Sequence, residues 1–260
     1  MNALSRSSAV RWPRSGGAPR QTGATLAEFV VVGPIAILII MALIQIGMMM
    51  VAKQVVNEAS FEAARTGASE HASTSEMTKA LKRKLLPFYQ ASTDATGAYN
   101  GNDYSRMTGA VAAEIADIDI NSIFSGPRLT LQRLSPPDSA FNDFGISVSD
   151  SSGNHTAIPN DNLEYRIYAG YKGPQSGLTI QDANELRIKV VYAYELKVPL
   201  MKTVFGSVMC GIDSAIDAFG HNDSGGINVG NDCSDYYKRG RVPIVTYATV
   251  QMQSDAWQEG

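Results

Sequence analysis

The sequence predicts an α+β fold, in which a long apolar N-terminal helix precedes a domain with an antiparallel sheet. An uncharged run of 24 residues occupies positions 29–52, and helical periodicity continues from there to residue 67. Segments with alternating apolar residues follow after residue 127. Helices that come first and strands that come later favour α+β over alternating βαβ units.

The composition excludes several classes of protein. A chain of 260 residues that is 44% hydrophobic and 18% charged is neither disordered nor collagen-like, and it is not a small disulfide scaffold. The net charge of −3 argues against nucleic acid as a partner, because phosphate binding requires a clustered basic face.

The run at 29–52 predicts a transmembrane helix. As a helix it spans roughly 36 Å, against a hydrocarbon core of about 30 Å. Pro34 and Gln45 reduce its apolarity without reversing it. A buried helix of a soluble core seldom runs this long without a charge, and a cleaved secretory signal has a shorter apolar region of about 7–15 residues. Met50 also stands where such a signal needs a small residue, so the span is expected to stay in the protein.

Charge around the span predicts its orientation. Four arginines and no acidic residue precede position 28, whereas residues 53–70 hold two basic and three acidic residues. The positive-inside rule then places the N-terminus in the cytoplasm and residues 53–260 outside.

The two cysteines, Cys210 and Cys233, fall in the exported part. An oxidising compartment favours a disulfide between them, which contributes about 3 kcal/mol in the chain-entropy model. Two free thiols are the alternative. Because there is no CxxC motif and the three histidines are scattered, we predict no metal site.

Beyond the apolar helix we expect a second helix at about 75–86, where Ser73 and Glu76 have capping-box spacing. A polar loop (91–110) and a short helix (110–117) follow.

Period-two segments predict strands at 128–134, 163–168, 186–198 and 242–252, with a polar loop between the first two. In the third, every even position is apolar and most odd positions are charged, so we expect one buried and one wet face. A helix from Pro199 to about residue 219 precedes the last strand.

Enzyme motifs are absent or incomplete. There is no GxSxG, HExxH or phosphate-binding Gly loop. Residues 223–226 resemble the serine-nucleophile segment of chymotrypsin-like proteases, but Asn222 replaces the preceding Gly. Residues 117–121 begin like a calcium loop, yet Ser122 replaces the turn Gly and Arg128 the bidentate Glu. We therefore predict no enzyme activity, no catalytic residue and no cofactor.

The start of the span carries the most specific pattern. Gly23 precedes the small residue Ala24, and Glu28 follows five positions after the Gly. This resembles the cleavage site of type IV prepilins, which a membrane peptidase cuts after the Gly on the cytoplasmic side.

More narrowly, residues 20–67 resemble the TadE-like minor pseudopilins of tight-adherence (Tad, type IVc) pili. The features shared with that family are the pair Glu28-Phe29, Pro34, and the segment Ala63-Ala64-Arg65-Thr66-Gly67. Type II secretion pseudopilins share the Gly and the Glu but usually lack a Pro so early.

The resemblance implies a prepilin leader (1–23), a transmembrane helix with its extension (24–67) and an exported, pilin-like α+β domain (68–260). It also implies cleavage between Gly23 and Ala24. In related pilins the Glu pairs with the terminal amine of a neighbouring subunit, which sets the register of assembly. A helix-stabilising role for Glu28 is the local alternative.

The function implied is that of a minor pseudopilin in assembly or priming of a Tad-type pilus, for adherence and biofilm formation. The expected partners are a prepilin peptidase, other Tad pilins and the inner-membrane pilus platform. The chain would be single-pass in the bacterial inner membrane with its C-terminal domain in the periplasm, either retained there or incorporated in the pilus. The alternatives are a type II secretion pseudopilin and a single-span periplasmic enzyme or sensor.

Overall fold

The computed structural model describes residues 24–89, 103–120, 127–150, 153–166, 171–204, 207–208, 236 and 239–259. The chain divides into two compact units, residues 1–42 and 43–260. The bounds predicted from sequence, 1–23, 24–67 and 68–260, stay predictions.

The helix α1 (Ala24–Ser69) is continuous through 46 residues and contains Pro34. In the first unit its described side chains are exposed or half-exposed and almost entirely apolar. Among the described residues, α1 is the one helix long and apolar enough to cross a membrane. This helix is compatible with a single-pass membrane protein.

The second unit is built on a three-stranded antiparallel sheet with the order β1 (Leu129–Ser135), β4 (Glu185–Glu195), β5 (Arg241–Gln251). These strands confirm the predictions at 128–134, 186–198 and 242–252 within a few residues. Together with the helices, the sheet confirms the predicted α+β class.

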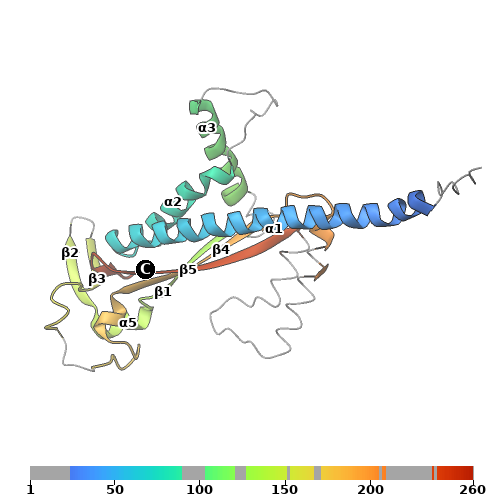
Figure 1. The fold of residues 1–260 in the computed structure, drawn as a ribbon. Helices are drawn as coiled ribbons and strands as arrows, with labels where there is room; N and C mark the ends of the chain where they lie inside the picture. The colour runs from blue at the N-terminus through green and yellow to red at the C-terminus, as the bar shows by residue number, and fades with distance from the viewer. Residues whose placement is uncertain are drawn as a thin grey trace, which may run out of the picture. The chain divides into compact units, whose positions relative to one another are not determined.

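The C-terminal half of α1 lies over one face of this sheet (Figure 1). Its buried positions are mostly small, which lets the helix approach the strands closely: Ala52, Ala59, Ser60, Ala63, Ala64 and Ala68. Ser60 Oγ donates to Val56 O (2.7 Å), so the 2.6 Å contact with Thr246 Oγ1 of β5 has Thr246 as its donor. The sheet face beneath holds the even residues of β4, as the alternation predicts.

The opposite face of β4 is only partly exposed to solvent, so the prediction of a solvent-exposed face is wrong. Arg187 is exposed, but Lys189, Val191 and Ala193 are all buried. Because β4 is the central strand, side chains from both neighbours flank it; the ring of Tyr247 on β5, for example, lies 5.8 Å from Lys189 Nζ.

A second antiparallel sheet combines β2 (Ile146–Asp150), β3 (Gly153–Ile158) and β6 (Ala256–Trp257), and α5 (Asp138–Phe144) packs beside β3. The sequence predicted a loop for β2, β3 and α5, because their residues are mostly polar.

The prediction of a strand at 163–168 is wrong for residues 163–166, the part that the structure describes. Residues 161–166 form turns, with Asn162 at φ 51° and Arg166 N donating to Asn162 O (3.1 Å). Asn162 adopts the left-handed conformation, which asparagine tolerates, and its carbonyl accepts from Tyr165 N and Arg166 N, so these amides close a turn instead of pairing with a strand.

The helix predicted at 75–86 is confirmed as α2 (Thr74–Leu85), followed by η1 (Leu86–Phe88). The predicted capping box is wrong, because the Ser73 side chain makes no cap hydrogen bond and Glu76 pairs with Lys79 instead (2.6 Å). Glu259 caps α2, accepting from Thr74 N at 2.6 Å. A capping box does occur at the short helix α6 (Ile180–Ala183).

The helix predicted at 110–117 begins earlier than expected, since α3 (Asp103–Glu114) and η2 (Ile115–Ile120) together cover 103–120. The predicted loop is therefore wrong over 103–110, and its residues 91–102 lie outside the described residues. Met201–Val204 are helical as predicted after Pro199, while most of the helix predicted there also lies outside them.

Candidate functional site

The predicted cleavage and assembly residues lie at the start of α1. Gly23 is outside the described residues, and Ala24 is the first residue of the helix. Glu28 and Phe29 follow one turn later with exposed side chains, and Phe29 is 76% exposed. The Phe29 ring lies over Gly33, within 3.8 Å of where a Cβ would stand.

The segment Ala63–Gly67, which contributes to the family resemblance, is the place where α1 docks on the sheet. Ala63 and Ala64 are fully buried. A Cβ on Gly67 would collide with Met77 Sδ of α2 and would stand 2.9 Å from Leu186 Cδ2 of β4. This part of the motif therefore has a packing role, since only glycine leaves room for the helix–sheet contact.

The C-terminal residues 252–259 tie the end of α1 to both sheets. Ala68 O accepts from Gln253 N (2.9 Å) and Ser254 N (3.0 Å). The Trp257 ring is stacked between the imidazoles of His71 (3.7 Å) and His155 (4.4 Å).

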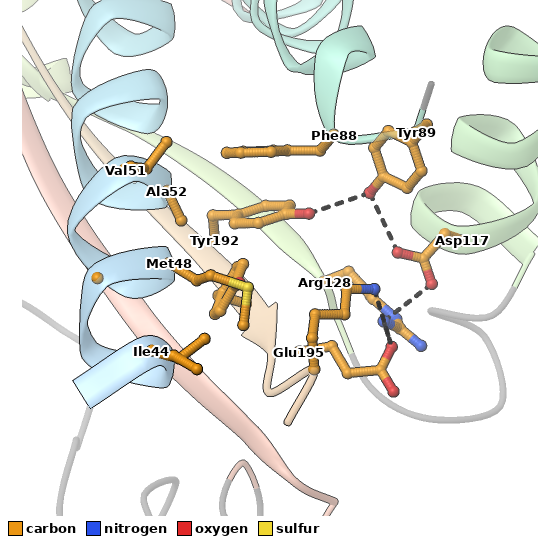
Figure 2. A pocket seen from close by; sticks show the side chains of 13 residues that line it. Ile44, Met48, Val51, Ala52, Phe88, Tyr89, Asp117, Arg128, Tyr192 and Glu195 are labelled. Atoms are coloured by element: carbon orange, nitrogen blue, oxygen red, sulfur yellow. Dashed lines mark hydrogen bonds and ion pairs between the residues drawn. The ribbon is translucent and has the colours of Figure 1, made fainter. Parts of the chain in front are cut away.

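One pocket of about 530 Å³ lies in the second unit, beside the first turns of α1 in that unit. Figure 2 shows its two contrasting walls. The apolar wall consists of α1 residues and one η1 ring: Ile44, Gly47, Met48, Val51, Ala52 and Phe88. The polar wall combines Tyr89, Asp117, Arg128, Glu195 and Lys197, with Tyr192 and Tyr194 between the two.

A chain of polar contacts runs along the second wall (Figure 2). Tyr89 Oη donates to Asp117 Oδ2 (3.1 Å), so Tyr192 Oη is the donor in its 3.3 Å contact with Tyr89. Asp117 Oδ1 lies 2.9 Å from Arg128 Nη1, which is 4.0 Å from Glu195 Oε2. These contacts connect the residue after η1, the helix η2, the residue before β1 and the end of β4.

Burial sets the protonation of this wall. It raises the pKa of the Tyr89 phenol, assisted by Tyr192 and Asp117, and it also raises the pKa of Tyr192. Burial acts to raise the pKa of Glu195 as well, but Lys202, Lys197 and Arg128 outweigh it and the pKa of that carboxyl is lowered. The phenols are therefore neutral and Glu195 is ionised at neutral pH.

Sequence reasoning missed this cluster. Asp117 and Arg128 were noticed only as parts of an incomplete calcium loop, and the structure pairs them with each other. Among the described residues, no group of three or more His, Cys, Asp or Glu side chains could hold a metal ion.

Cys210 and Cys233 lie outside the described residues, so their disulfide stays a prediction. Cys210→Ser should lower the free energy of unfolding by about 3 kcal/mol, because the bond restricts the unfolded chain. Denaturant melts of the oxidised protein, with and without reductant, measure this; Cys210→Ser should abolish the effect of reductant. Alkylation of both thiols before reduction would reject the bond.

The comparisons with known proteins bear on the N-terminal part of the chain. The family model for TadE-like protein matches residues 23–65. No curated protein and no solved structure matches the chain. The match covers the apolar part of α1 and its extension as far as Arg65, and so includes Glu28, Phe29 and Pro34. Residues 23–65 are thus a TadE-like region, which confirms the resemblance seen in the sequence and links the chain to the Tad pilus system.

Proposed function

We propose that the chain is a minor pseudopilin that acts in the assembly or priming of a Tad-type pilus, and thereby in adherence and biofilm formation. The observation that carries this proposal is the TadE-like match at residues 23–65, on a helix whose N-terminal side chains are apolar and exposed.

Processing and topology follow from the same proposal. A prepilin peptidase removes residues 1–23 by cutting between Gly23 and Ala24, on the cytoplasmic side of the inner membrane. The arginine-rich N-terminus supports this orientation, with the second unit in the periplasm. Other Tad pilins and the inner-membrane platform are the assembly partners.

The large second unit favours a minor subunit. It contains two antiparallel sheets and several helices, far more than a bare helical pilin needs to pack in a filament. A type II secretion pseudopilin and a single-span periplasmic enzyme or sensor remain the competing classes. The pocket beside α1 is lined by titratable groups, and ion pairs and hydrogen bonds connect several of these to each other.

Processing tests the proposal most directly. Mass spectrometry of the protein from its native host should find Ala24 as the first residue, and Gly23→Arg should leave the leader attached because the bulky side chain cannot enter the peptidase site. Gly17→Arg is the matched control, since it adds the same charge six residues upstream of the junction and should be cut normally. An intact Met1 terminus in cells with an active prepilin peptidase would contradict the pilin assignment.

A further inference from the structure

The pocket beside α1 has the two-sided chemistry of an amphiphile site. Ile44, Met48 and Val51 supply an apolar wall, and Ile44 and Val51 are more than half exposed. Arg128 and Glu195 face this wall across the cavity (Figure 2). A ligand that fills the pocket must therefore present an apolar chain to one side and charged groups to the other.

Contacts of α1 place this pocket along the helix. Gln45 is fully buried, and its Oε1 accepts from Val198 N (2.9 Å). The predicted span, residues 29–52, is roughly 36 Å long as a helix, and a hydrocarbon core of about 30 Å that begins at residue 29 ends near residue 48. If the chain spans the membrane in this way, as the proposed function supposes, the edge of the hydrocarbon lies at the level of the pocket.

The headgroup layer on each side of a bilayer is about 5–8 Å thick. The pocket-lining part of α1 from Ile44 to Ala52 rises about 12 Å, so it runs from the edge of the hydrocarbon into that layer. Tyr89, Tyr192 and Tyr194 line the pocket as well, and each can present a hydroxyl group to a polar headgroup. The polar wall thus lies at the depth of phospholipid headgroups.

The charged residues of the polar wall indicate which kind of headgroup the pocket can bind. Arg128 and Lys197 are cationic, Asp117 and Glu195 are anionic, and all four line the pocket. The Arg128 side chain is 11% exposed, and its Nε makes no hydrogen bond within the structure described. A guanidinium N–H suits a phosphate oxygen, and a carboxylate suits an ammonium.

We propose that this pocket binds one zwitterionic phospholipid, with its phosphate at Arg128 and Lys197 and its ammonium at Glu195. The first part of an acyl chain lies against Ile44 and Met48 and continues along α1 into the bilayer. Lys202 donates to Glu195 Oε1 (3.1 Å), whereas Arg128 and Lys197 are both 4.0 Å from Glu195 Oε2, so the ammonium pairs with Oε2. A purely anionic headgroup fits less well, because it would bring negative charge to this oxygen. The lipid would fix the depth of the second unit at the membrane surface.

Native mass spectrometry of the full chain in mild detergent tests this site, with added phosphatidylethanolamine or phosphatidylglycerol. Wild type should retain one phosphatidylethanolamine and bind it more tightly than phosphatidylglycerol. Arg128→Gln should weaken binding about tenfold, the size expected for one lost charge-assisted hydrogen bond.

Arg128→Gln leaves Asp117 without its ion-pair partner and could weaken binding by misfolding. A second variant therefore tests the pocket without breaking this ion pair. A Cβ at Gly47 meets nothing within 4 Å, so Gly47→Leu fills the pocket without breaking a polar contact, and it should weaken binding by a similar factor. Lys53→Gln is the matched control: Lys53 is exposed at the end of the apolar run and outside the pocket, and affinity should stay within about twofold.

Three results would overturn the site. They are equal retention of both lipids, unchanged binding in a folded Gly47→Leu variant, and a lipid-free dimer that Gly47→Leu converts to monomer, which would make a second copy the occupant. These readouts use purified protein, so they are separable from the proposed function. Normal processing without lipid retention rejects only the lipid site, and lipid retention without processing rejects only the pilin role.

Discussion

Glu28→Gln should abolish pilus assembly while membrane insertion and leader removal stay normal. If the Glu28 carboxylate pairs with the Ala24 amine of a neighbouring subunit, the substitution leaves that amine uncompensated at low dielectric, a loss of several kcal/mol. If Glu28 only stabilises the start of its own helix, the cost is about 0.3–1 kcal/mol and assembly should continue. The two roles of Glu28 are therefore distinguished by whether the Glu28→Gln strain assembles pili.

The measurement is pilus yield and surface adherence of the native host, with cleavage confirmed by mass spectrometry. Glu58→Gln is the matched control, because Glu58 lies on the same helix, is exposed and undergoes the same chemical change. Wild-type pili from a strain with processed Glu28→Gln protein would remove the assembly role that we assign to this residue.

Gly67→Val should destabilise the second unit by about 3 kcal/mol, near the upper end of the range for overpacking a core. The new side chain would collide with Met77 and Leu186, which are both fully buried and have no free space to move into. Because valine has a better helix propensity than glycine, the substitution also stabilises the helix, but only by a few tenths of a kcal/mol. For a unit of this size the melting temperature should fall by roughly 6–12 °C.

Thermal unfolding of the detergent-solubilised chain, followed by near-UV circular dichroism, measures this effect. Gly47→Ala is the control on the same helix, because a Cβ there meets nothing within 4 Å, and its melting temperature should not fall. An unchanged melting temperature for Gly67→Val would show that α1 and α2 can separate at this point without cost, contrary to the packing described.

Secondary-structure elements that depend on residue types at short spacings along the sequence were predictable. The strand at 186–198 was evident because each even residue is apolar, and β5 was predicted from a period of two in the same way. The helix α2 was predicted from the spacing of Ser73 and Glu76, although the cap itself does not form. β2 was missed because its alternating run, Ile146 to Ser149, is only four residues long and lies in a polar segment. β3 was missed because it begins with Gly, Asn, His and Thr and does not alternate, and only Ala157 and Ile158 of β3 are buried.

The cap of α2 shows why local rules fail elsewhere. Ser73 and Glu76 have the right spacing, but Glu259, 185 residues from Thr74, accepts the hydrogen bond from the helix N-terminus. The closing segment reaches this point because β5 carries the chain back beside β4 to the end of α1. A spacing rule cannot anticipate a partner that arrives through sheet pairing.

The sequence by itself determined the apolar helix, the α+β class and the TadE-like region, because each depends on residue types at fixed short spacings. Only the tertiary structure decided the candidate pocket. Its walls come from α1, η1, η2 and the ends of β1 and β4, elements separated by up to 150 residues. They meet because α1 packs on the sheet through small residues and β1 pairs with β4, which brings Arg128 between Asp117 and Glu195.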